Sequence, residues 1–144
     1  MNLTASSWLF WALLSAVFAA LTAIFAKVGV EGINSDLATF IRTLVVVATL
    51  GVLLAATGQF QAPGSISGRS YLFLLLSGLG TGASWLCYFR ALKLGEAAKV
   101  APIDKLSVVL IAVFGVVFLG ERLSAPNWLG IALVATGAIL VAWR

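Results

Sequence analysis

Five long apolar runs constrain the fold of this chain more than any other feature. Each run can cross a hydrocarbon layer of ~30 Å as a helix that rises ~1.5 Å per residue. The runs are roughly Trp8–Ala26, Leu37–Thr57, Tyr71–Phe89, Val100–Leu119 and Pro126–Trp143. The connecting segments are short and leave no room for a soluble domain. The pattern predicts an all-α integral membrane protein with five transmembrane helices, formed as a single domain over residues 1–144.

The composition agrees with a lipid environment. Hydrophobic residues make up 62% of the chain and charged residues 10%, whereas about a quarter of a soluble domain is charged. The net charge of +4 does not indicate nucleic acid, because the sequence has no basic patch interleaved with aromatic residues. The chain has no histidine, the commonest metal ligand and general base, and its one cysteine, Cys87, cannot form an intrachain disulfide. We expect no cofactor and no metal.

The first apolar run could be a cleaved signal peptide or a retained helix. The preceding stretch, MNLTASSW, contains no Lys or Arg, and the run is longer than the apolar core of a typical signal peptide. We interpret it as a retained helix.

The distribution of Lys and Arg predicts the orientation in the membrane. Five helices place the first and third loops and the C-terminus on one face, and the N-terminus with the other two loops on the opposite face. The first of these faces carries five cations and the opposite face two. They are Lys27, Arg90, Lys93, Lys99 and Arg144, against Arg69 and Arg122. Because cytoplasmic loops are enriched in Lys and Arg, we expect the face with five cations to be cytoplasmic.

Charged side chains from four predicted helices gather at this cytoplasmic face, although a charge deep in hydrocarbon costs ~3 kcal/mol or more. The candidates for a gate or for ion coupling are Lys27, Arg42, Arg90, Asp104 and Lys105. Neighbours on a helix point ~100° apart, so we expect Asp104 to pair with Arg42, Arg90 or a ligand rather than with Lys105.

Asp104 has three interpretations. If Pro102 is the first helical position, Asp104 lies in the first turn, where free N–H groups favour a carboxylate, and Lys105 extends to the lipid head groups. Alternatively, Asp104 belongs to an ion-pair gate, which is compatible with the first interpretation, or it binds a solute or a proton directly. If transport is proton-coupled, Asp104 is the first candidate, because it is the only carboxylate well inside a predicted segment.

Hydroxyl groups follow one face of the third predicted helix at positions i, i+4, i+7 and i+11. Hydroxyls gain nothing by facing lipid, so this stripe faces protein or a water-filled path. Alternatively, these groups bond their own backbone or a neighbouring helix. The candidates for lining a substrate path are the stripe, Ser77, Thr81, Ser84 and Tyr88, together with Trp11, Thr22, Trp85 and Ser107.

The sequence resembles a known family. Residues 89–143, FRALKLGEAAKVAPIDKLSVVLIAVFGVVFLGERLSAPNWLGIALVATGAILVAW, are similar to the end of an EamA domain of the drug/metabolite transporter superfamily, with FLGERLS the most specific part. AIFAKVG with Lys27 and FIRTLVV with Arg42 extend the resemblance over essentially the whole chain. DKLSVV, residues 104–109, is similar to a short bacterial group that has one five-helix domain.

The resemblance implies transport of a small organic solute or metabolite by alternating access in a bacterial inner membrane. Typical members of the superfamily contain ten helices, built as two such domains in inverted orientation, with helices 1, 3 and 4 of each half lining a cavity. This chain would then be one half of the architecture, completed by a second copy. We favour an antiparallel homodimer, because an inverted repeat gives alternating access a physical basis. A parallel dimer or a different partner chain is the alternative, since the five-to-two cation bias fits dual insertion poorly.

Two other functional classes compete with transport. A non-transporting accessory subunit or scaffold would use small-residue helix faces to pack a partner, and the hydroxyl stripe speaks mildly against it. An intramembrane enzyme is disfavoured, because the sequence has no histidine and no metal cluster. A Ser–Lys protease is also disfavoured, because Lys105 and Ser107 would lie ~200° apart around a helix.

Overall fold

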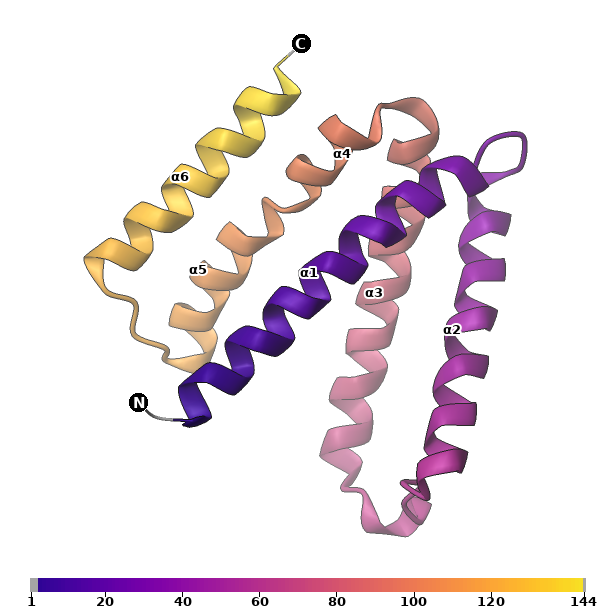
Figure 1. Cartoon of the computed structure of the whole chain (residues 1–144). Helices are drawn as coiled ribbons and strands as arrows, with labels where there is room; N and C mark the ends of the chain where they lie inside the picture. The colour runs from indigo at the N-terminus through magenta and orange to yellow at the C-terminus, as the bar shows by residue number, and fades with distance from the viewer. Residues whose placement is uncertain (1–2, 144) are drawn as a thin grey trace. The chain divides into compact units, whose positions relative to one another are not determined.

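The computed structural model describes residues 3–143, which form helices and loops (Figure 1). The helices are α1 (Leu3–Gly29), α2 (Ser35–Thr57), α3 (Gly68–Leu94), α4 (Ala97–Asp104), α5 (Ser107–Leu119) and α6 (Ala125–Ala142), with a short 3-10 helix, η1 (Pro63–Ser65), before α3. The chain forms two compact units. Ala26–Lys93 is the α2–α3 unit, and the flanking segments form the α4–α6 unit. Arg144, counted in the predicted charge bias, lies outside the described residues.

Within residues 3–143, five helical spans are long and apolar enough to cross a membrane, as the sequence predicts. They are Trp8–Gly29, Ser35–Thr57, Gly68–Leu94, Ala97–Leu119 and Ala125–Ala142. Few apolar side chains are buried in the described structure, and most of the large ones are exposed. In water a protein with so much exposed apolar surface would aggregate. In a bilayer the same side chains contact lipid. The chain is a multi-pass membrane protein.

The fourth span differs from its prediction. It begins at Ala97 rather than at Val100, and it is broken, because α4 ends at Asp104 and α5 begins at Ser107. Pro102 lies inside α4 and not at its first position. The interpretation that places Asp104 in the first turn of a helix was therefore wrong, since Asp104 is the last residue of α4.

We attribute this break to Pro102, three residues before it. Pro102 has no N–H to donate to the carbonyl of Ala98, one turn earlier, and its ring crowds that carbonyl. In the turn that follows, the bonds change toward the 3-10 type: the Lys105 N–H is shared between the Ala101 carbonyl at 3.3 Å and the Pro102 carbonyl at 3.1 Å, and the Leu106 N–H donates to the Ile103 carbonyl at 3.0 Å. The span is thus two short helices joined by a tight turn at residues 105 and 106.

In the α4–α6 unit, α4 and α5 both pack along α6 (Figure 1). The sequence of α4, AAKVAPID, is rich in alanine, and Ala138 of α6 is buried. In lipid the hydrophobic effect does not drive helices together, so helix association depends on close packing, which small residues allow. At the end of α5, Gly120 adopts a φ of 69°, and the Glu121 N–H returns to the Gly115 carbonyl at 3.0 Å. This left-handed residue turns the chain toward α6.

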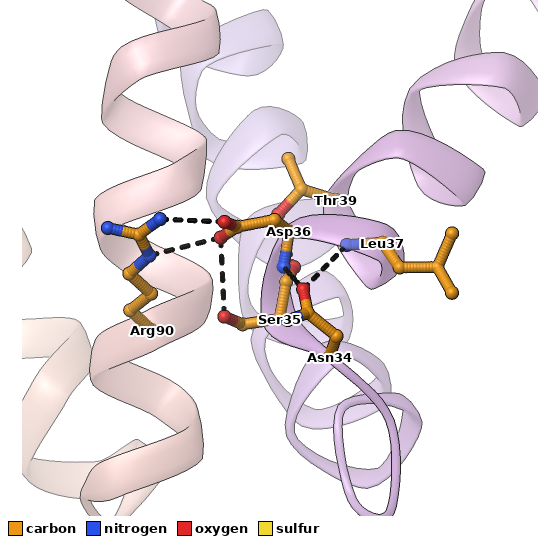
Figure 2. Close-up of polar contacts among 6 residues, drawn as sticks. All are labelled: Asn34, Ser35, Asp36, Leu37, Thr39 and Arg90. Atoms are coloured by element: carbon orange, nitrogen blue, oxygen red, sulfur yellow. Dashed lines mark hydrogen bonds and ion pairs between the residues drawn. The ribbon is translucent and has the colours of Figure 1, made fainter.

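In the α2–α3 unit, α2 and α3 form an antiparallel hairpin (Figure 1). The side chain of Asn34 caps α2 by accepting hydrogen bonds from the backbone N–H groups of Asp36 and Leu37 at 2.8 and 3.2 Å (Figure 2). The helix ends at Gly58, which adopts a φ of 65°. The hairpin places the N-terminus of α2 beside the C-terminus of α3, and most of the charged groups of this unit lie at that end.

Candidate functional site

A charged cluster connects α1, α2 and α3 at one end of the α2–α3 unit. We call its four members, Lys27, Asp36, Arg90 and Lys93, the charged clasp. Arg90 binds Asp36 through two hydrogen bonds, from Nε to Oδ1 at 3.0 Å and from one terminal nitrogen to Oδ2 at 2.6 Å (Figure 2). The planar guanidinium matches the two carboxylate oxygens. Asp36 also lies in the first turn of α2, where the helix dipole favours a negative charge.

The two lysines of the clasp bind backbone carbonyls. Lys27, in the last turn of α1, donates to the carbonyl of Leu92 in α3 at 2.7 Å. Lys93, in the last turn of α3, donates to the carbonyl of Ile33 in the loop before α2. The last carbonyls of a helix have no partner within it, and cations are favoured there. The lysines therefore tie the end of α3 to α1 and to the α1–α2 loop.

Asp36 is the site residue that the sequence analysis missed. Arg90 was one of three partners considered for Asp104, whereas the structure pairs Arg90 with Asp36. A signal was present, because Asp36 precedes the second apolar run and Arg90 ends the third. Two consecutive antiparallel spans place those two positions at the same membrane face.

Asp104 binds its neighbour Lys105, with 3.1 Å between Oδ2 and Nζ. The prediction that these neighbours cannot pair was wrong, because it assumed a continuous helix. The helix ends at Asp104, and the long Lys105 side chain folds back to its carboxylate. Whether Asp104 gates or couples transport remains a prediction.

Arg42 of α2 lies over an aromatic surface of α3. Its guanidinium carbon is 4.1 Å from the centroid of the Trp85 ring and 5.5 Å from that of Phe89. The position is about 9 Å along the helix axis from Asp36. The structure thus adds to the charged clasp a second contact between α2 and α3, deeper in the span.

The predicted path residues are distributed over both units. Ser77, Ser84, Trp85 and Tyr88 belong to the α2–α3 unit with Thr81, while Trp11, Thr22 and Ser107 belong to the α4–α6 unit. The hydroxyl of Thr81 donates to the Ser77 carbonyl at 2.9 Å, which is the backbone bond considered as an alternative. Trp85 and Tyr88 are half-buried, and Ser77, Thr81 and Ser84 are exposed. Their role as a path lining stays a prediction.

Comparison with known proteins confirms the predicted family. The chain matches the EamA-like transporter family over residues 6–143. A relative from Sinorhizobium sp, 67% identical over 136 residues, is named an uncharacterized transporter in the cobO 3' region, and the match covers 94% of this chain and 96% of the relative. No solved structure matches the chain. With five candidate spans, these matches indicate a membrane transporter rather than an enzyme. The chain belongs to the EamA-like transporter family.

Proposed function

We propose that this protein moves a small organic solute across a bacterial cytoplasmic membrane by alternating access, as an antiparallel homodimer. The observation that carries the proposal is one set of five spans matched by the family over residues 6–143. Two such sets in opposite orientation form an inverted repeat, whose two halves can exchange conformations and so open a central site to either side in turn.

The charged groups have distinct parts in this proposal. The charged clasp gates one end of α2 and α3 by holding their termini together. The break at Lys105 and Leu106 gives the fourth span a hinge, and Asp104 beside it is the candidate for ion coupling. Trp85, Tyr88 and the hydroxyl stripe of α3 line the path.

Transport is tested with purified protein in proteoliposomes, to which radiolabelled anionic, cationic and uncharged small solutes are added from outside. We expect saturable uptake of at least one solute at a rate well above that of empty liposomes. The accessory-subunit alternative predicts no uptake by the protein alone and a distinct protein that co-purifies with it. That combination would contradict the proposal.

The antiparallel dimer is tested by topology. Two reporters, one active only inside the cell and one only outside, are fused after Arg144 in separate strains. We expect signal from both, because each copy inserts in one of two orientations. As a control, the same reporters inserted at Gly64, in the exposed loop between α2 and α3, should give the reciprocal ratio of signals. A signal from the inside reporter alone would exclude the antiparallel homodimer and favour a parallel dimer or a different partner.

A further inference from the structure

Arg42 is a cation within a membrane span. It is the eighth residue of α2, about 10 Å along the axis from the first residue, Ser35. A cation at such a position is costly and is normally matched by a partner of opposite charge or by a functional ligand. The neighbours of Arg42 within residues 26–93 therefore indicate what this cation binds.

The aromatic contact satisfies one face of the guanidinium and leaves its edge available. The guanidinium carbon lies 4.1 Å from the centroid of the Trp85 ring and 5.5 Å from that of Phe89. Phe89 is 3% exposed, so this side of the guanidinium faces a buried aromatic ring. A cation–π contact uses the flat face of the group, whereas its N–H donors lie in the plane and point outward. An oxyanion can therefore bind the edge of Arg42 in a bidentate manner without displacing Trp85.

The described α2–α3 unit provides no carboxylate for this edge. Its acids are Glu31 and Asp36. Glu31 lies in the exposed loop before α2, and both oxygens of Asp36 are bound by Arg90. Tyr88 of α3 interacts electrostatically with Arg42, but a phenol hydroxyl does not neutralise the guanidinium as a carboxylate would. Tyr88 lies one turn from Trp85 on α3 and adds a phenol hydroxyl to the same helix face.

We propose that Arg42, held over Trp85, binds the oxyanion group of the transported solute, so that the substrate class is a small organic carboxylate or phosphate. This inference rests on the proposed transport function, which it makes more specific. A lipid phosphate has the same chemistry and is the other possible source of the oxyanion. The stacked geometry favours the solute, because an arginine that serves a head group extends along the helix toward the interface, whereas Arg42 is packed across onto α3.

Binding is measured on the full-length protein in a maltoside detergent, which contains no phosphate, so that free anions compete with no head group. The probes are the sodium salts of glutamate, citrate and inorganic phosphate, with chloride at equal ionic strength as the reference. The readout is the thermal unfolding midpoint as a function of probe concentration. We expect saturable stabilisation of the wild type by at least one probe, because a ligand of the native state raises its stability.

The variants identify the residue responsible. We expect Arg42→Gln to raise the half-saturating probe concentration by at least about tenfold, because it removes a charged hydrogen bond. Arg42→Lys keeps the charge but loses the paired N–H donors of the planar guanidinium. It should raise the half-saturating probe concentration by less than Arg42→Gln does. Arg69→Gln is the matched control, since Arg69 also lies over an aromatic ring, Phe73 at 5.8 Å, near the other end of α3. We expect Arg69→Gln to have the same half-saturating probe concentration as the wild type.

Three results would overturn the inference. The first is that no probe anion stabilises the wild type, and the second is that Arg42→Gln binds like the wild type. The third is stabilisation by added phosphatidylglycerol alone, lost in Arg42→Gln, which would assign the site to a lipid head group. If Arg42→Gln does not elute as a folded species, Arg42→Lys and Trp85→Leu give the same comparison, and each should weaken probe binding several-fold.

The same variants separate this inference from the proposed function. Uptake of an uncharged or cationic solute at an equal rate by the wild type and Arg42→Gln would overturn the anion site and leave transport intact. Arg42-dependent binding of a probe, without uptake of any solute by the proteoliposomes, would overturn transport and leave the anion site intact.

Discussion

Pro102→Ala is expected to convert the fourth span into a continuous helix, to stabilise the protein and to slow transport. Proline in a helix interior costs about 3 kcal/mol relative to alanine. The 3-10 turn after Pro102 relieves part of that strain, so we expect a gain of about 1–2 kcal/mol rather than the full value. The new N–H at position 102 would also restore the hydrogen bond to the Ala98 carbonyl.

The expected loss of transport follows from the proposed mechanism. Broken helices in transporters absorb backbone rotation and expose carbonyl groups to the central cavity. In this chain the break lies at Lys105 and Leu106, directly after Asp104. A continuous helix would fix the orientation of α4 relative to α5 and would hold the span in one conformation. We therefore expect uptake to fall several-fold while the protein becomes more stable.

Spin labels at Ala97 and Leu119, in a Cys87→Ser background, measure the change directly. A straight helix of this length spans about 33 Å, and the distance between labels in Pro102→Ala should increase toward the value that such a helix gives. Pro126→Ala is the matched control, because Pro126 lies in the first turn of α6, where proline is tolerated. An unchanged distance and unfolding midpoint in Pro102→Ala would show that proline does not cause the break.

The spans could be predicted from the sequence because they depend only on length and apolar content. The break could not, because Pro102 fits two positions equally well: the first residue of a helix or the interior of one. The deciding fact is that α4 begins at Ala97, in the segment GEAAK that precedes the apolar run. That segment is polar enough to be interpreted as a loop, but its Ala and Lys residues favour a helix, and α4 packs beside α6.

The candidate site was predictable in location but not in pairing. Topology brings the charged ends of the first three spans to one face, and hence Lys27 and Arg90 to the clasp. Pairing depends on how each helix is rotated about its axis, and the sequence does not specify this rotation. The stacking of Arg42 on Trp85 is a consequence of such a rotation. The error about Asp104 and Lys105 arose because ideal helical angles were applied across a helix end.

Reversing the charges of the clasp one at a time is expected to impair transport unequally. The clasp contains three cations and one acid, so Asp36→Arg would leave four cations facing one another. Arg90→Asp would leave two acids and two lysines, and Lys27 or Lys93 could then bind the second carboxylate. We expect Asp36→Arg to lower both uptake and the unfolding midpoint more than Arg90→Asp. The double variant should recover most of the loss, although an arginine in the first turn of α2 opposes the helix dipole.

A double-mutant cycle on the unfolding midpoint and on uptake tests this coupling. The matched control is the ion pair between Lys99 of α4 and Glu96, the residue directly before α4, with 3.4 Å between Nζ and Oε2. Exposed helix pairs of this kind contribute little, so Lys99→Glu and Glu96→Lys should change neither readout appreciably. If the double variant of the clasp is as impaired as the sum of its single variants, Arg90 and Asp36 act independently. The gate would then have to be sought at the break in the fourth span.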